Sequence, residues 1–458
     1  MQAELNQGTG QMPGRSKQEH MVKLWTCAGL LAAAALLTAC SRDFILEGER
    51  FPLRAPFSED AGEAPVNRAQ PIALPPAVVN PDWTHRLGSP STRINHPSLG
   101  NSLQQLWSVP IGQGDGRRHR ITAEPVAAGG LIYTLDSRAR VSAVTTGGET
   151  AWTRDLTPPF ARSSDAASGG GLAIADGRLY VTSAFGMLWA LDLATGADIW
   201  SKRFDAPLAA APTISGAHVY VVANDSTAWA IDAASGQTDW QLSGAPSPSS
   251  MVGGPAPAVS GDLVLFPTPA GELIAARRDT GQIIWRRAVA GTRIGVAYAA
   301  VTDVTGDPVV QGERIFVGNQ SGRVMALDRS DGRPIWTADE AAYGPVWPVG
   351  DSVFLMSDRN RVVRLDAGSG DFIWGQALPL HTRDRERRRA EVYPHYGPTL
   401  AGGRLIVGSG DGVLRSLDPV SGEVLSTTEL RSGAASAPIV MGGTLYVVSR
   451  DGRLTAYR

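Results

Sequence analysis

The chain has 458 residues, of which 52 are Gly and 31 are Pro, and 43% of the residues are hydrophobic. This composition is too apolar for a disordered chain and too rich in turn-forming residues for a helical bundle, so it favours many short strands. The formal net charge of -2 argues against the concentrated basic face that a nucleic-acid-binding protein needs.

A strongly apolar segment lies near the N-terminus. Lys23 precedes a run of apolar residues that is short for a membrane span and ends in small residues, as secretory signals do. We therefore expect residues 1–39 to be a signal peptide. Residues 1–20 are polar and unpatterned, which leaves Met21 as an alternative start.

The end of this segment indicates lipidation. Residues 37–40 read Leu-Thr-Ala-Cys, which resembles the lipobox of bacterial lipoproteins, where the Cys becomes the acylated first residue of the mature chain. The resemblance implies that Cys40 is lipidated and that Ser41 directs the protein to the outer membrane. An ordinary signal peptide or an uncleaved anchor helix is the alternative. The second cysteine, Cys27, lies inside the same segment, so no disulfide or thiolate metal site is expected further along the chain.

Residues 40–102 lack a strand or helix pattern and contain nine prolines. Such a stretch buries too little apolar surface to offset the entropy of ordering it, so we expect a flexible tether that gives the folded head reach from a membrane. Within it, Asp82–His96 is a candidate to pack on the head as a strap.

A repeat begins near Leu103. The stretch 177–200 contains two alternating apolar runs joined by a short turn, then a third strand that follows Thr195-Gly196 and carries Trp200. A similar sequence pattern recurs along the chain. The tryptophans of successive repeats lie 38 to 51 residues apart, which is the period of propeller blades. These tryptophans are Trp107, Trp152, Trp200, Trp240, Trp285, Trp336 and Trp374.

The two ends of the repeat predict how the ring closes. A seventh copy has Ser426 where the Trp should stand, and an eighth copy, 445–458, stops before its final strand. Residues 103–109 form an isolated strand with Trp107 and no blade of their own. We predict an all-β, eight-bladed β-propeller over residues 103–458, with four-stranded antiparallel blades, closed by pairing of this strand into the last blade.

The recurrent residues have structural interpretations. A Trp at the same place in successive blades packs between neighbouring sheets, which we favour over an aromatic binding platform. The Asp of each Leu-Asp pair precedes a Thr-Gly or Ser-Gly turn, which favours capping of turn amides over an acidic cluster. These are Asp192, Asp232, Asp328, Asp366 and Asp418.

The blade text Leu-Asp-x-x-[Thr/Ser]-Gly-x-x-x-Trp resembles the tryptophan-docking repeats of the pyrroloquinoline quinone propellers, over nearly all of residues 103–458. Within that superfamily, a lipoprotein signal joined to one eight-bladed head resembles the BamB family of outer-membrane assembly lipoproteins. The resemblance implies a monomeric, non-catalytic scaffold on the periplasmic face of the outer membrane. It would dock onto the barrel subunit BamA and other assembly subunits and assist unfolded barrel proteins.

The resemblance also implies partner-binding loops. The segment 302–308 resembles an inter-blade loop with acidic contacts, in which Asp303 matches and Thr305 replaces a second acid. The preceding loop, 249–253, falls where the family has apolar residues followed by Arg; Met251 fits this pattern and Val252 does not. The alternative is that both loops only connect blades.

Two further functions remain open at this stage. A quinone-dependent dehydrogenase shares the ring but adds adjacent cysteines over the cofactor, a calcium site and a catalytic Asp; adjacent cysteines are missing from the sequence. We therefore expect no catalytic residue, cofactor or metal. A propeller that binds an envelope polymer is also compatible, because the basic insertion 381–389, followed by His395, could grip an acidic partner, although a solvated loop is the simpler interpretation.

Overall fold

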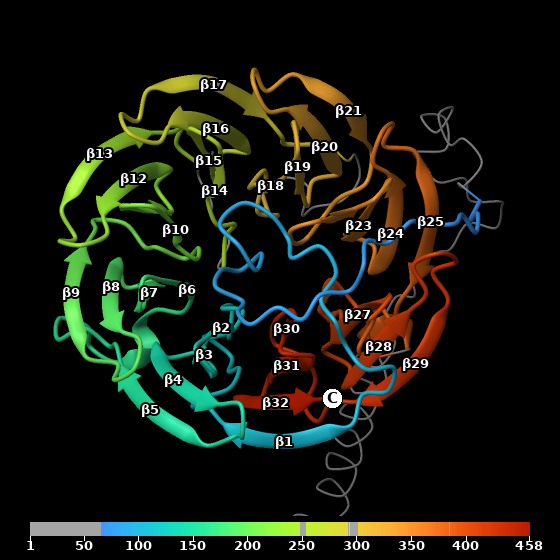
Figure 1. The fold of residues 1–458 in the computed structure, drawn as a ribbon, viewed down its shortest axis with the longest axis horizontal. Coiled ribbons are helices and arrows are strands. Elements are labelled where there is room, and N and C mark those ends of the chain that lie inside the picture. The colour runs from blue at the N-terminus through green and yellow to red at the C-terminus, as the bar shows by residue number, and fades with distance from the viewer. Residues whose placement is uncertain (1–65, 248–252, 292, 294–300, 384) are drawn as a thin grey trace, which may run out of the picture. The chain divides into compact units, whose positions relative to one another are not determined.

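The structure is a computed structural model that describes residues 66–247, 253–291, 293, 301–383 and 385–458. These belong to one compact unit, Pro65–Arg458. Eight four-stranded antiparallel sheets are arranged as blades around a central axis (Figure 1). In the described part of the chain, no helix is long and apolar enough to cross a membrane.

Successive groups of four strands in the sequence form successive blades, apart from β1, which belongs to the last blade. Blade 1 consists of β2 (Val126–Ala128), β3 (Leu131–Leu135), β4 (Arg140–Thr145) and β5 (Thr150–Asp155). Blade 2 consists of β6 (Gly170–Ala175), β7 (Arg178–Ser183), β8 (Met187–Asp192) and β9 (Asp198–Arg203). Blade 3 consists of β10 (Thr213–Ser215), β11 (His218–Val222), β12 (Thr227–Asp232) and β13 (Thr238–Ser243). Blade 4 consists of β14 (Ala258–Ser260), β15 (Leu263–Pro267), β16 (Glu272–Arg277) and β17 (Ile283–Ala288).

The second half repeats the plan. Blade 5 consists of β18 (Val309–Gln311), β19 (Arg314–Asn319), β20 (Arg323–Asp328) and β21 (Pro334–Ala338). Blade 6 consists of β22 (Trp347–Val349), β23 (Ser352–Met356), β24 (Arg361–Asp366) and β25 (Phe372–Ala377). Blade 7 consists of β26 (His395–Ala401), β27 (Arg404–Ser409), β28 (Val413–Leu417) and β29 (Val424–Glu429). Blade 8 consists of β30 (Ile439–Met441), β31 (Thr444–Ser449), β32 (Arg453–Tyr457) and β1 (Gln105–Pro110). Two short 3-10 helices, η2 (Ser164–Ala166) and η4 (Glu386–Arg388), lie in the connections.

The ring closes as the sequence predicts. β1 pairs antiparallel with β32, so that Trp107 lies opposite Ala456 and Val109 opposite Leu454. Gln104 and Arg458 exchange two backbone hydrogen bonds of 2.9 Å each just beyond these strands. The pairing confirms the eight-bladed, N-terminally closed propeller, in which two distant parts of the sequence complete one sheet.

Local turns shape each blade. Asp192 accepts hydrogen bonds from the amide and the hydroxyl of Thr195, at 2.9 and 2.6 Å. These bonds hold the pKa of the Asp192 carboxyl below its usual value. Gly196, at φ +70°, completes the turn in a conformation that favours glycine. The recurrent Asp therefore caps a turn, as the sequence indicated.

The seven tryptophans lie between adjacent blades. The ring of Trp200 in blade 2 packs on Gly236 in the outer turn of blade 3, where a Cβ would lie 2.8 Å from a ring atom. Its Nε1 donates to the carbonyl of Ala233, 3.1 Å away. The other six rings pack in the same way on Gly148, Gly196, Gly281, Gly332, Gly370 and Gly422. Each Trp thus joins its blade to the next blade along the chain.

The closure explains why Ser426 replaces the Trp of blade 7. In every other blade a Gly-containing turn connects the two outer strands and receives the ring. In blade 8 the outer strands β32 and β1 come from opposite ends of the sequence, so no turn connects them. A Trp at position 426 would have no glycine turn on which to pack, and Ser426 is exposed.

An N-terminal segment lies inside the circle of blades (Figure 1). Residues 66–77 run inwards from β25, where the amide of Arg68 donates to the carbonyl of Ile373 at 2.9 Å. Residues 78–98, which we call the strap, form a loop whose ends meet: the amide of Ser98 donates to the carbonyl of Val78 at 2.7 Å. Leu87 and Trp83 are buried, with exposed fractions of 3% and 1%.

Within the expected tether 40–102, the candidate strap Asp82–His96 packs on the head as the sequence indicated, and the described residues on either side of it also belong to the compact unit. The compact unit includes everything from Pro65 onwards. The strap is held because Trp83 packs against Trp347 with a centroid separation of 6.4 Å, and because its backbone pairs with inner strands. The predicted signal peptide and the first part of the tether lie outside the described residues.

Candidate functional site

The strap contacts the innermost part of all eight blades in ring order. Hydrogen bonds join Asn80 to Val440 in blade 8, Trp83 to Ala127 in blade 1, Thr84 to Ile174 in blade 2, His85 to Ile214 in blade 3, Pro90 to Val259 in blade 4, Ser91 to Val310 in blade 5, Arg93 to Pro345 before β22 in blade 6, and Pro97 to Gly402 after β26 in blade 7. The eighteen residues from Asn80 to Pro97 therefore make one complete turn around the axis.

A buried charge cluster fixes the strap near the axis. Nη1 of Arg86 lies 2.7 Å from Oδ1 of Asp307, and its Nε lies 3.1 Å from Oε1 of Glu124. Nη1 also donates to the carbonyl of Gly254 at 3.3 Å. The Asp307 side chain is 1% exposed and the Glu124 side chain 9%. One guanidinium thus joins loops that belong to blades 1, 4 and 5.

Burial sets the protonation of this cluster. It raises the pKa of the Asp307 and Glu124 carboxyls above their usual values, and Arg86 offsets part of the rise. Burial alone would lower the pKa of Arg86, but the two carboxylates outweigh it and raise that pKa. Arg93, buried over the ring of Trp347, has its pKa lowered to about 10 by burial. Two cations and two carboxyls therefore share a poorly hydrated site. Removal of one partner would leave a buried charge without compensation and destabilise the fold.

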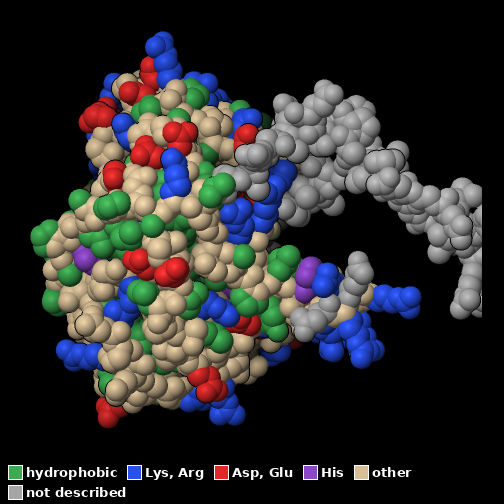
Figure 2. Space-filling model, turned by 90° about the vertical axis from the view of Figure 1, so that its right-hand side faces the viewer, with side chains coloured by type: hydrophobic (Ala, Val, Ile, Leu, Met, Phe, Trp, Pro, Cys, Tyr) green, Lys and Arg blue, Asp and Glu red, His purple; other side chains and the backbone are tan. Residues whose placement is uncertain are grey.

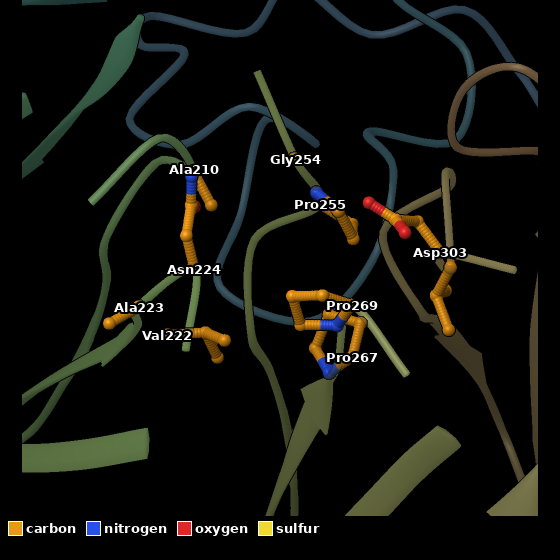
Figure 3. A pocket seen from close by; sticks show the side chains of 10 residues that line it. Ala210, Val222, Ala223, Asn224, Gly254, Pro255, Pro267, Pro269 and Asp303 are labelled. Carbon is orange, nitrogen blue, oxygen red and sulfur yellow. The ribbon is translucent and has the colours of Figure 1, made fainter. Parts of the chain in front are cut away.

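The predicted contact residues Asp303 and Thr305 lie close together but are buried, with exposed fractions of 4% and 5%. The hydroxyl of Thr305 donates to the carbonyl of Ala342. Asp303 lines a small pocket, where its carboxylate points towards Gly254 and Pro255 (Figure 3). The cavity of about 20 Å³ has room for about one water molecule.

The other predicted site residues are placed differently. Met251, Val252 and the predicted lipidation site Cys40 lie outside the described residues. His395 is buried; its Nε2 lies 2.8 Å from the carbonyl oxygen of Pro379 and its Nδ1 lies 2.7 Å from the Ser409 hydroxyl. Among the described residues, no group of three or more His, Cys, Asp or Glu side chains could hold a metal ion.

Sequence reasoning missed Arg86 and its two carboxylate partners. Glu124 and Asp307 stand in connections, where an isolated acid carries no periodic signal. The available signal was the apolar content of the strap, with Trp83 and Leu87 in a stretch otherwise typical of a tether. A large aromatic side chain in such a stretch indicates that the residue is buried, even where the neighbouring residues are typical of a tether.

Comparison with known proteins identifies the family. The sequence matches the family model described as outer membrane protein assembly factor BamB over residues 137–376 and 385–458. The chain belongs to the BamB family. A BamB from Shewanella oneidensis is 24% identical over 444 residues, which cover 94% of this chain and 98% of that protein.

Solved structures share the BamB fold. The crystal structure of BamB from Moraxella catarrhalis superposes with a TM-score of 0.65 at 24% identity, covering 78% of this chain and 100% of that one. The quinohemoprotein alcohol dehydrogenase from Comamonas testosteroni gives a TM-score of 0.63 at 16% identity, covering 83% and 81%. At these identities the likeness shows the ring alone, because one ring serves unrelated functions.

Proposed function

We propose that this protein is an outer-membrane protein assembly factor: a non-catalytic ring, anchored by a lipid on Cys40, that binds the barrel subunit BamA. The observation that carries the proposal is the match to the BamB family over most of the blades. A rigid ring suits this task because it presents its loops at fixed positions for a partner to dock on.

The strap holds the loop 302–308 against the residues that follow the loop 249–253. Arg86 pairs with Asp307, which belongs to the loop 302–308, and with the carbonyl of Gly254, which directly follows the loop 249–253. The amide of Ala256 donates to the same Asp307 oxygen at 3.0 Å. These bonds fix the loop 302–308 against residues 254–256, so the strap supports the part of the surface around Asp303 that we assign to the partner.

The burial of Asp303 decides how this site should be probed. The sequence alone predicts that reversing the charge of Asp303 weakens partner binding without unfolding the head. A cation in a position that is 4% exposed would also destabilise the loop, because a buried charge without a partner is costly. The nearly isosteric Asp303→Asn change removes the charge and keeps the volume, so it separates binding from folding.

The test is the affinity of the head for the periplasmic domains of BamA, measured by biolayer interferometry. Loss of one charged hydrogen bond is worth about 1.5–3 kcal/mol, so we expect Asp303→Asn to weaken binding by about tenfold or more. Asp262→Asn is the matched control, because that carboxylate is exposed on blade 4 and its one ion pair within the described part of the chain is with Arg277. Unchanged affinity for Asp303→Asn, with both melting temperatures preserved, would contradict the assignment of this loop.

The lipid anchor has a separate test. Expression with a radioactive fatty acid should label the wild-type chain, and the Cys40→Ala variant should remain unlabelled and leave the outer-membrane fraction. Labelling of the variant would show that another residue carries the lipid.

The axis of the ring supports a non-catalytic role. The strap already contacts the innermost strands of the blades, and a second cavity, lined by Arg86 and Glu124, has only about 10 Å³ of free space. Incubation with pyrroloquinoline quinone and calcium should give no stoichiometric uptake in an absorbance titration. Tight uptake coupled to alcohol oxidation would favour the dehydrogenase alternative instead.

A further inference from the structure

A basic hairpin projects between blades 6 and 7. Its base is closed by a bridge between His381 and Val392 and by a hydrogen bond of 2.9 Å from the amide of Tyr393 to the carbonyl of Leu380. Within the hairpin, the amide of Thr382 donates to the carbonyl of Glu391 at 3.0 Å. We call residues 381–383 and 385–391 the basic arm. Its closed base gives the arm a defined position on the ring.

The arm carries five exposed cations. They are Arg383, Arg385, Arg387, Arg388 and Arg389. Among the salt bridges of the described residues, none involves Arg383, Arg385 or Arg387. Figure 2 faces the side of the ring that carries β25, and there a group of basic side chains projects beyond the rest of the surface. Arg383, Arg385 and Arg387 are therefore available to an external anion.

Two exposed aliphatic side chains flank the base of the arm. Leu380 is 40% exposed and Val392 is 54% exposed. Arginines next to exposed aliphatic residues are the combination found where a protein lies on a membrane: the cations meet lipid phosphates and the apolar groups enter the headgroup boundary. A soluble anionic polymer would use the cations and leave the aliphatic residues in water.

The start of the described chain lies on the same blade. Asn67 exchanges hydrogen bonds of 2.9 and 3.3 Å with the backbone of Gly375 in β25, and the arm follows β25 in sequence. Residues 41–65 therefore connect the predicted lipid on Cys40 to the blade that bears the arm. A chain of twenty-five residues reaches at most about 80–90 Å even when it is fully extended. The anchor would thus keep blade 6 within that distance of the leaflet that holds the lipid.

We propose that the basic arm binds anionic phospholipid headgroups of that leaflet and so fixes which side of the ring faces the membrane. The inference goes beyond partner binding and takes from the proposed function only the lipid anchor. The lipid supplies proximity, and the arm supplies orientation through its phosphate contacts.

The test uses the soluble chain 41–458, which keeps all eight blades and lacks the signal segment and Cys40. Co-sedimentation is measured with vesicles of phosphatidylcholine alone and with vesicles containing about a third phosphatidylglycerol. We expect binding only to the anionic vesicles, reduced by raising the salt because exposed charges are screened. The double variant Arg385→Glu/Arg387→Glu should bind at least about tenfold more weakly.

The matched control is Arg117→Glu/Arg118→Glu, which changes the net charge equally at two exposed arginines between β1 and β2. It should retain wild-type vesicle binding, and all variants should keep the wild-type melting temperature. Equal losses in both double variants would overturn the proposal, because binding would then follow net charge. Absence of wild-type binding to anionic vesicles, or binding of the arm to soluble peptidoglycan fragments instead, would also overturn it. Affinity of the arm variant for BamA is measured in parallel and should be unchanged, so the two proposals can fail separately.

Discussion

The strap makes the head sensitive to acid through His85. This side chain is 5% exposed, and its Nε2 lies 3.1 Å from the backbone nitrogen of Ile214. An amide can only donate, so Nε2 is the unprotonated nitrogen, and Nδ1 donates its hydrogen to the hydroxyl of Thr84 at 2.9 Å. Protonation would place an N–H group against the amide of Ile214 and break the contact between the strap and blade 3.

The size of the effect follows from the pKa. Burial lowers the pKa of His85 from 6.5 to about 4. A lowered pKa in the folded state means that the stabilisation is complete above pH 6.5 and is lost as the pH falls towards 4. At about 1.4 kcal/mol per pKa unit, the loss is about 2 kcal/mol at pH 5 and about 3 kcal/mol at pH 4.

The assay compares urea unfolding of the wild type and the His85→Gln variant at pH 7.5 and pH 5. Glutamine offers an amide oxygen to the Ile214 amide and does not titrate, so the variant keeps an acceptor and loses the pH dependence of this position. We expect the wild type to lose about 2 kcal/mol more than the variant over this interval. Hydrogen exchange at Ile214 should accelerate in the wild type alone. Equal losses in the two proteins would refute the reasoning, because the acid sensitivity would then come from other groups.

Further predictions concern the blade contacts and the charge cluster. Gly236→Ala places a Cβ about 2.8 Å from the Trp200 ring. Gly177→Ala is the matched control, because its Cβ meets nothing within 4 Å and its φ of +70° is close to the +75° of Gly236. Urea unfolding should show that Gly236→Ala lowers the free energy of unfolding by about 1–3 kcal/mol more than Gly177→Ala does. Trp200→Ala should destabilise the ring by about 3 kcal/mol, seen as a lower melting temperature. Ser426→Trp should leave the melting temperature unchanged, and a rise of several degrees would reveal a docking turn that blade 8 lacks. Arg86→Met should cost about 3–5 kcal/mol in calorimetry, because it leaves buried carboxylates without their cation; a neutral result would show that water replaces it.

Much of the ring can be predicted from the sequence because each blade repeats the same local chemistry. Trp200, the glycine turn and the Leu-Asp pair recur at a regular spacing, and each has a physical reason to stand where it does. The incomplete eighth copy and the isolated strand around Trp107 fit only one arrangement, and β1 pairs with β32 as that arrangement requires.

The sequence indicated a strap at Asp82–His96 but not the contacts that it makes. These contacts are mostly single hydrogen bonds to eight different blades, so the strap has no period-two pattern, and its prolines are typical of a tether. The burial of Asp303 depends on how three neighbouring connections pack, which no local pattern encodes. The replacement of Trp by Ser426 looks like decay of the repeat until the closure shows that no turn faces it.

The course of the strap has a consequence for how the molecule is made. Residues 78–98 precede every blade in the sequence, yet their partners extend from Ala127 to Val440. The strap, which is synthesised before every blade, can therefore complete its contacts only after the last blade has formed. Loop closure over several hundred residues is slow and entropically costly, so docking of this segment is expected to be a late step in folding. The strap therefore distinguishes a complete ring from an incomplete one, because only a ring with all eight blades in order satisfies every hydrogen bond that the strap makes.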